Sequence, residues 1–337
     1  MLRHITLLMG LTFGTMTQAE APVVVTDIAP IHSLVARVMQ GVGTPDLIIP
    51  QSSSPHGYAM RPSQAAALQD ARLVVWMGPG LSPWLKDPLA TLAPDAQHMN
   101  LMEAHGTHIL PWREGASFDV EGHDDEDHDD EAHDHDGHDD EGHDDEGHDD
   151  EGHAEEGHDD HHGHDHDGPD PHAWLDPENA ALWLGEIAVA LGALDPENAA
   201  IYLANATTGQ AELARLNEEI SAQISTLDDP RFVVSHDALH YFEARFDVHA
   251  RGAVADGDAA APGAARLSNL KKVMQDQAIT CIMVEPGTDT DRLGAIFDSQ
   301  MHFGEIDLLG QRQSLGVTLY PGLLRAIAQN LSDCAVH

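Results

Sequence analysis

Short apolar runs alternate with helical patterns along the first part of the chain. The run LVVWMG at 73–78 is apolar at almost every position, which is typical of a parallel strand buried on both faces. Other positions repeat at steps of three and four, as on one face of a helix. Strands are predicted at 23–27, 46–50, 73–78 and 98–102, and helices over 30–40 and from Pro62. This alternation predicts an α/β lobe with a parallel sheet.

The same alternation returns in the last third of the chain. The runs FVVSHD and ITCIMVE are continuous and rich in β-branched residues, so they indicate buried strands. Strands are predicted at 232–237, 248–254, 279–285 and 305–310, with helices over 238–244, 267–277, 290–300 and 320–331. The sequence therefore predicts a second α/β lobe.

A long helix is predicted between the two lobes. The tetrapeptide DPEN occurs at Asp176 and again at Asp195. In it Asp caps a helix, Pro takes the first helical position and Glu faces the positive end of the dipole. The second copy predicts a helix from Pro196 to Leu227, about 48 Å long.

The fold class expected is α/β, with two lobes of parallel-type sheets joined by one long rigid helix. The predicted division is a signal peptide at 1–19, an N-terminal lobe at 20–194, a linking helix at 195–228 and a C-terminal lobe at 229–337. The N-terminal lobe includes a low-complexity segment at 119–168.

That segment, which we call the acidic histidine tract, consists almost entirely of His, Asp, Glu and Gly. A five-residue histidine period fits neither a helix face nor a strand face, and the composition offers too little apolar area for folding, so disorder is predicted. Imidazoles and carboxylates at this density predict weak auxiliary metal binding. The histidines concerned are His123, His128, His133, His135, His138, His143, His148, His153, His158, His161, His162, His164 and His166.

Charge and the N-terminus narrow the class of protein. The formal net charge is -42, and outside the tract acidic residues still outnumber basic ones about two to one. Such a charge argues against nucleic acid and anionic membranes as partners and suits cations. Residues 1–19 have a basic start, a short apolar run and small residues at the end, which is typical of a secretory signal and predicts a soluble exported protein.

Two cysteines, Cys281 and Cys334, are present. In an oxidising compartment an even pair is compatible with one disulfide, and two unrelated buried thiols are the alternative.

Three histidines and one carboxylate are candidate ligands for a metal ion. His56 follows one predicted strand, His236 lies at the end of another, and ligands in open α/β sheets bind beyond the carboxyl ends of strands. His172 lies just before the first DPEN helix, and Asp307 in the last predicted strand. Three imidazoles and one oxygen make a four-coordinate zinc site, although positions so far apart in sequence only suggest it.

Several segments resemble one family. SPHGYAMRPSQAAALQDARLVVWMGPGLSPWL, PHAWLDPENA and RFVVSHDALHYFE are similar to the three ligand regions of the cluster A-I solute-binding proteins of metal ABC transporters, and ITCIMVEPG, IDLLG and LSDCAVH to the end of that family. An acidic His-rich insertion before the second region marks its zinc-specific ZnuA type. The resemblance covers nearly the whole mature chain.

The resemblance implies His56, His172 and His236 as zinc ligands, with either Asp307 or water in the fourth place. Manganese-binding members usually carry a carboxylate where His236 stands here. Some zinc-binding members have Glu directly before the first histidine, and Pro55 rules that ligand out in this chain. The resemblance also implies a disulfide between the two cysteines.

The function implied is that of a monomeric periplasmic protein that captures Zn²⁺ and delivers it to an inner-membrane ABC permease, without catalysis. The alternatives are a periplasmic zinc buffer and a manganese-uptake or adhesin role. A zinc hydrolase is a further class, but the HExxH and GxSxG motifs are absent from the sequence. His240 is interpreted as a packing or surface histidine, and Glu285 as structural or as a partner of a ligand.

Overall fold

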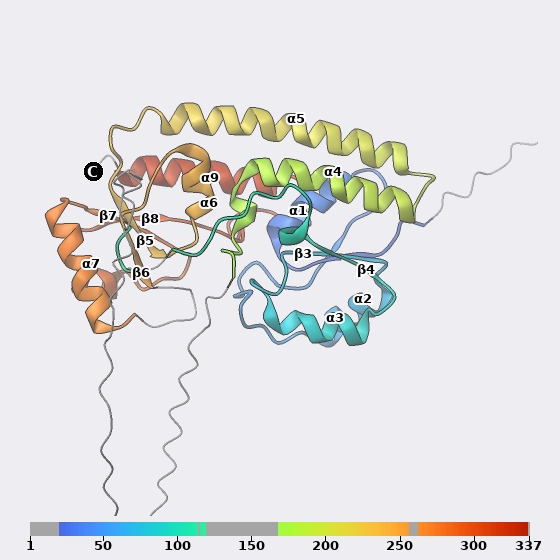
Figure 1. Cartoon of the computed structure of the whole chain (residues 1–337), viewed down its shortest axis with the longest axis horizontal. Coiled ribbons are helices and arrows are strands. Elements are labelled where there is room, and N and C mark those ends of the chain that lie inside the picture. Colours follow the sequence, from blue (N-terminus) through green and yellow to red (C-terminus); the bar gives the residue numbers. More distant parts are fainter. Residues whose placement is uncertain (1–19, 114, 119–167, 256–261, 336–337) are drawn as a thin grey trace, which may run out of the picture. The chain divides into compact units, whose positions relative to one another are not determined.

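The computed structural model describes residues 20–113, 115–118, 168–255 and 262–335 (Figure 1). The predicted signal peptide and the acidic histidine tract, apart from Gly168, lie outside the described residues. Among the described helices, none is long and apolar enough to cross a membrane.

The first sheet has four parallel strands in the order β2-β1-β3-β4. The strands are β1 (Val24–Thr26), β2 (Asp46–Leu47), β3 (Leu73–Trp76) and β4 (Gln97–Asn100), and the helices between them are α1 (Ala29–Val38), α2 (Pro62–Asp70) and α3 (Lys86–Leu92). All four residues of β3 are buried. This matches its continuous apolar pattern.

The second sheet repeats this topology in the order β6-β5-β7-β8, again all parallel. Its strands are β5 (Phe232–His236), β6 (Ala253–Ala255), β7 (Cys281–Val284) and β8 (His302–Glu305), with helices α6 (His240–Phe246), α7 (Ala264–Asp276) and α8 (Thr290–Ile296). The predicted α/β class with two parallel sheets is confirmed.

Two predicted strands were placed wrongly. The predicted strand 248–254 begins five residues too early. The observed strand β6 spans Ala253–Ala255 and pairs with β5. The predicted strand 305–310 ends as a strand at Glu305, because residues 306–310 turn away from β7 after the Val284–Glu305 pair. Asp307 therefore lies in a turn beyond β8.

Three longer helices complete the described structure. They are α4 (Pro177–Leu194), α5 (Ala199–Ile224) and α9 (Leu319–Ala335). Two of them, α5 and α9, contact elements that surround both sheets. Helix α5 contacts α1 and α4 from the first half and α6 and α9 from the second (Figure 1). Its 26 residues give a length of about 39 Å. The division into lobes and a linking helix at 195–228 stays a prediction, and buried side chains from both sheets form one contiguous core.

The two DPEN copies behave differently. At the first, the Asp176 side chain accepts a hydrogen bond from the Glu178 N–H and Pro177 begins α4. At the second, Asp195 ends α4, and its carboxylate accepts hydrogen bonds from Asn198 and Tyr202. The predicted start of the long helix at Pro196 is therefore wrong by three residues, because Asp195 is used for a buried turn.

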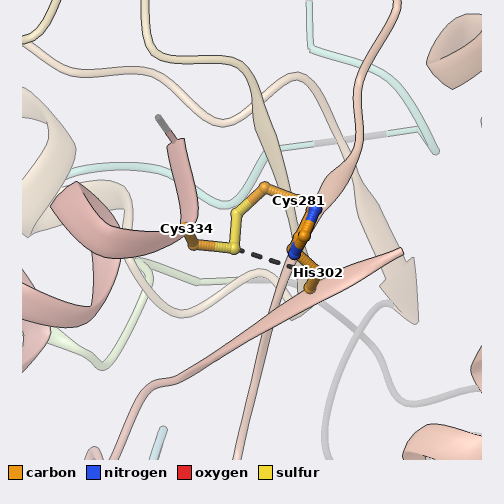
Figure 2. The surroundings of a disulfide bond; sticks show 3 residues. All are labelled: Cys281, His302 and Cys334. Atoms are coloured by element: carbon orange, nitrogen blue, oxygen red, sulfur yellow. Dashed lines mark hydrogen bonds between the residues drawn. A yellow bond between two sulfur atoms is a disulfide. The ribbon is translucent and has the colours of Figure 1, made fainter. Parts of the chain in front are cut away.

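A disulfide joins Cys281 of β7 to Cys334 of α9 (Figure 2). The sulfur of Cys334 also lies 3.7 Å from the carbonyl oxygen of His302 on β8. The bond therefore fastens the last helix to the middle of the second sheet, as the family resemblance implies.

Asp27 is a fully buried carboxyl group directly after β1. Its two oxygens accept hydrogen bonds from the N–H groups of Ile28 and Met77, each at 2.8 Å. Desolvation outweighs these bonds and raises the pKa of Asp27 from 3.8 to about 7. The folded state therefore prefers the neutral acid, and the unfolded chain loses this proton at a lower pH.

We expect this group to lower the stability of the protein as pH rises from about 4 to about 7. The unfolded state releases the proton near its ordinary pKa while the folded state retains it, which costs about 1.4 kcal/mol per pH unit across that window. Urea unfolding of the wild type and of Asp27→Asn, with a chelator present, measures this effect. The unfolding free energy of the wild type minus that of the variant should fall as pH rises. Asp46→Asn, at an exposed position on β2, is the control. A difference for Asp27→Asn that does not change with pH contradicts the buried neutral acid.

Candidate metal centre

The three predicted histidines come from separate elements and meet. His236 is the last residue of β5, His56 lies in the loop after β2, and His172 is the residue before the short 3-10 helix Ala173–Leu175. The ring centroid of His172 lies 6.3 Å from that of His56 and 5.5 Å from that of His236. The carboxyl ends of two parallel sheets thus contribute to one place, as expected for a ligand site in this class of fold.

The histidines line a small cavity of about 110 Å³. His172 and His236 are 2% and 4% exposed, whereas His56 is half-buried. The cavity is lined by Ser52, Ser53, Ser54, Pro55, His56, His172, Trp174, His236, Glu285, Leu308, Leu309 and Gln311. The cavity is therefore large enough for a metal ion together with several water molecules.

The ring spacing approaches that of a tetrahedral zinc site for His172 and His236 and is wider for His172 and His56. With Zn–N bonds of about 2 Å, the ring centroids of two imidazoles on one zinc ion are about 5 Å apart. Across the described ranges, no group of three or more His, Cys, Asp or Glu side chains has the spacing a bound metal ion requires. The ring of His56, the most exposed of the three histidines, lies farther from the His172 ring than this distance.

Asp170 fixes the orientation of the His172 ring. Its Oδ1 accepts a hydrogen bond from the His172 backbone N–H at 2.9 Å and lies 2.7 Å from Nδ1 of the ring. With the proton on Nδ1, the lone pair on Nε2 is available to a metal ion, an arrangement common in zinc sites. Sequence reasoning missed Asp170, although the pattern PDPH signals it, because Asp often accepts from the N–H two residues later.

Aromatic rings restrict the same imidazole. The Trp112 and Trp174 rings lie 5.8 and 5.2 Å from the His172 ring, and Trp174 Nε1 donates to the carbonyl oxygen of Leu308 at 3.2 Å. The rings limit rotation and exclude water. His172 is therefore positioned before any metal ion arrives.

The loop that carries His56 is held at both ends. The carbonyl oxygen of Pro55 accepts hydrogen bonds from Trp84 Nε1 at 2.8 Å and from Ser82 Oγ at 3.3 Å. Gln51 Nε2 donates to the carbonyl oxygens of Gly310 and Gln313, in the segment after β8. The loop thus bridges the two halves while the His56 side chain stays partly accessible.

Glu285 is the carboxylate that reaches the cavity. It follows β7, next to β5, and its Oε1 contacts Nδ1 of His236. This contact agrees with the interpretation of Glu285 as a partner of a ligand, and it orients His236 as Asp170 orients His172.

Asp307 does not join the histidines. Its two carboxylate oxygens accept hydrogen bonds from the N–H groups of Gln311 and Arg312, at 2.8 and 2.7 Å. Its neighbours Leu308 and Leu309 line the cavity, and Asp307 itself does not. Its carboxylate shapes the turn beneath the site.

His240 lies beside the centre rather than in it. Its Nδ1 is 3.9 Å from Asp170 Oδ2. Burial lowers the pKa of His240, and the positive charge of Arg113 adds to this effect. The packing interpretation of His240 therefore fits its place. The histidines of the tract lie outside the described residues.

A comparison with protein families agrees with a metal-binding site. A family model described as ZnuA, the periplasmic component A of a zinc-uptake complex, matches residues 24–334. The chain belongs to this family. The family is one of binding components of transporters, a class distinct from enzymes.

Curated relatives cover almost the whole chain. The high-affinity zinc uptake system protein ZnuA of Brucella abortus (strain 2308) is 38% identical over 322 residues, which is 95% of this chain and 94% of that protein. The protein of the same name from Paracoccus denitrificans (strain Pd 1222) is 37% identical over 339 residues and 99% of each chain.

Solved structures share the fold. A crystal structure of ZnuA has a TM-score of 0.69 at 21% identity and covers 94% of this chain and 99% of that chain. A Mn-bound periplasmic metal-binding protein from Candidatus Liberibacter asiaticus has a TM-score of 0.67 at 18% identity, covering 93% and 98%. Because the second protein holds manganese, the fold alone does not decide the metal.

Proposed function

We propose that this protein captures Zn²⁺ in the periplasm and delivers it to an inner-membrane ABC permease. The observation that carries the proposal is the meeting of His56, His172 and His236 around one small cavity. Membership of a zinc-uptake family supports the same conclusion. The metal ion is the cargo of the protein.

The donor set favours zinc over manganese. Neutral imidazole suits Zn²⁺, whereas Mn²⁺ prefers sites rich in carboxylate oxygens. Three imidazoles line the cavity, with Glu285 as the one carboxylate among the described lining residues. The fourth zinc position then belongs to water. Asp307 is less suited because two backbone N–H groups occupy its oxygens, and Glu285 contacts Nδ1 of His236 instead.

The acidic histidine tract has an auxiliary role in this proposal. Its sequence ends only a few residues before His172, so zinc bound weakly there is held close in sequence to a tight ligand. The signal-like N-terminus supports export, and the acidic charge supports cation binding without nucleic acid. The protein is expected to act as a monomer.

Zinc titration of the purified mature chain in competition with a chelator tests the function. We expect one tight equivalent of zinc and further weak equivalents, with the tight one retained after deletion of residues 119–167. Manganese in excess should fail to displace it. Loss of all tight binding on deletion of the tract would favour a zinc buffer instead, and displacement by manganese would favour manganese uptake.

A further inference from the structure

A partly buried arginine lies between two buried carboxylates beside the candidate centre. Arg113 Nε donates to Asp237 Oδ2 at 3.0 Å, and its two terminal nitrogens donate to Glu243 at 2.6 and 2.9 Å. A terminal nitrogen also contacts Asp237 Oδ1. The guanidinium stacks on the Phe118 ring at 3.9 Å. Arg113 thus forms two-point contacts with both carboxylates.

The charges of this cluster depend on one another. The side chains of Asp237 and Glu243 are 4% and 1% exposed, and that of Arg113 is 16% exposed. Burial lowers the pKa of Arg113, but the two carboxylates raise it by more than burial lowers it. The pKa of Arg113 therefore lies above its ordinary value. The guanidinium is therefore permanently charged and neutralises carboxylates that would otherwise be buried without a counterion.

The cluster is attached to the metal-site end of β5. Asp237 directly follows His236, and Glu243 in α6 also accepts a hydrogen bond from the N–H of Ala250 at 3.0 Å. A two-point guanidinium contact fixes direction as well as distance. The backbone that carries His236 is therefore held from one side by Arg113.

The segment that carries Arg113 also touches His172 and its partner. We call residues 108–113 and 115–118 the strap. The carbonyl oxygen of Leu110 accepts a hydrogen bond from the Asp170 N–H at 2.9 Å, and the hydroxyl of Tyr241 donates to the carbonyl oxygen of Asp170 while accepting from the Leu110 N–H. Trp112 packs on the His172 ring. One segment therefore contacts the supports of two histidines that come from different elements.

We propose that Arg113 is a positioning residue for the metal centre, which sets the place of His236 relative to His172 through Asp237 and the strap. The inference rests on the proposed zinc site and adds a residue that does not itself touch the metal ion.

Replacing the whole cluster by neutral residues tests this role without leaving a buried charge. The variant Arg113→Met, Asp237→Asn, Glu243→Gln is compared with the wild type as full mature chains. We expect the zinc Kd to rise by about tenfold, the low end of the range found when direct partners of metal ligands are removed, because this cluster acts through the backbone of His236. With half an equivalent of Co²⁺, the visible spectrum of the wild type should be that of a tetrahedral site, and the variant spectrum should shift or weaken.

A matched control lies at the other end of the same strand. The Arg251 side chain is also 16% exposed and contacts Asp229, before β5 begins. The variant Arg251→Met, Asp229→Asn should lose stability without a change in the cobalt spectrum or the zinc Kd. Arg113→Lys keeps the charge but lacks the planar two-point contact, so its zinc Kd should lie between those of the wild type and the triple variant.

The outcomes separate the two hypotheses. A wild type with no tight zinc or cobalt site would overturn the proposed function itself. If the wild type binds tightly and the triple variant has the same zinc Kd and cobalt spectrum, the positioning role alone is overturned. If the triple variant does not fold, Arg113→Lys decides, and an unchanged Kd and spectrum in that variant also overturn the role of Arg113.

Discussion

The triple variant His56→Ala, His172→Ala, His236→Ala is expected to lose the one tightly bound zinc ion. Zinc sites with four ligands bind with about 10–16 kcal/mol, so each ligand accounts for about 3 kcal/mol, or roughly a hundredfold in Kd. The loss of three leaves binding no tighter than that of the tract. Calorimetric titration of the variant lacking residues 119–167 measures this without the background of the tract.

The single variants should not be equal. His172 and His236 are almost fully buried and held by Asp170 and Glu285, so their removal also loses preorganised geometry. His56 is half-buried on a loop, where water can take the empty position. His56→Ala should therefore retain more affinity than either of the other two.

Exposed histidines away from the cavity supply the matched control. His98, His105 and His249 are exposed, and changing all three to alanine removes the same number of imidazoles. The tight equivalent should remain unchanged in this variant. Tight binding that survives the loss of the cavity histidines, or that disappears with the exposed ones, would show that the assigned ligands are wrong.

The sequence predicted much of this site because of simple geometry. Buried strands of the parallel type show as continuous apolar runs, and the ends of such strands gather at one edge of a sheet. The sequence pattern alone suggests such an edge for His236, at the end of a buried apolar run, and for His56, which follows the predicted strand 46–50. The match of His172 depended on the family resemblance, since no strand leads directly to it.

The supports of the site could not be read from the sequence in the same way. Arg113 and Asp237 are 124 positions apart, and no periodicity links them. Asp307 was expected at a strand end, but the chain turns after Glu305, and two backbone N–H groups take up its carboxylate. Local pattern places residues on elements, whereas the direction of a loop depends on hydrogen bonds between distant segments.

The arrangement of the core also affects how zinc can leave the protein. Helices α5 and α9 both contact α1 of the first half, and α9 also contacts β7 and β8 of the second. Moving the two sheets apart would expose the contiguous core that they share. Under the proposed function, the hydrophobic cost of that exposure favours release through movement of loops, and His56 is the most exposed of the three proposed ligands.

Removing the disulfide is expected to have the largest effect on stability. Cys281 and Cys334 are 53 positions apart, and in the chain-entropy model closure of a loop of that length stabilises the folded state by about 4 kcal/mol. The variant Cys281→Ala, Cys334→Ala should therefore unfold at a distinctly lower urea concentration. Wild-type protein unfolded in the presence of a reductant should show a similar loss.

Zinc binding should change little in the same variant. Cys281 begins β7 at its amino end, whereas Glu285 and the cavity lie beyond the carboxyl end of that strand. The bond fastens α9 to the amino end of the inner strand β7, so its loss should weaken the whole second half without moving His236. We expect the zinc Kd of the folded variant to stay within about threefold of the wild type, a difference of less than about 1 kcal/mol. A stability loss below about 1 kcal/mol contradicts the entropic role of the bond, and a large loss of affinity at full folding would mean that α9 positions the metal centre directly.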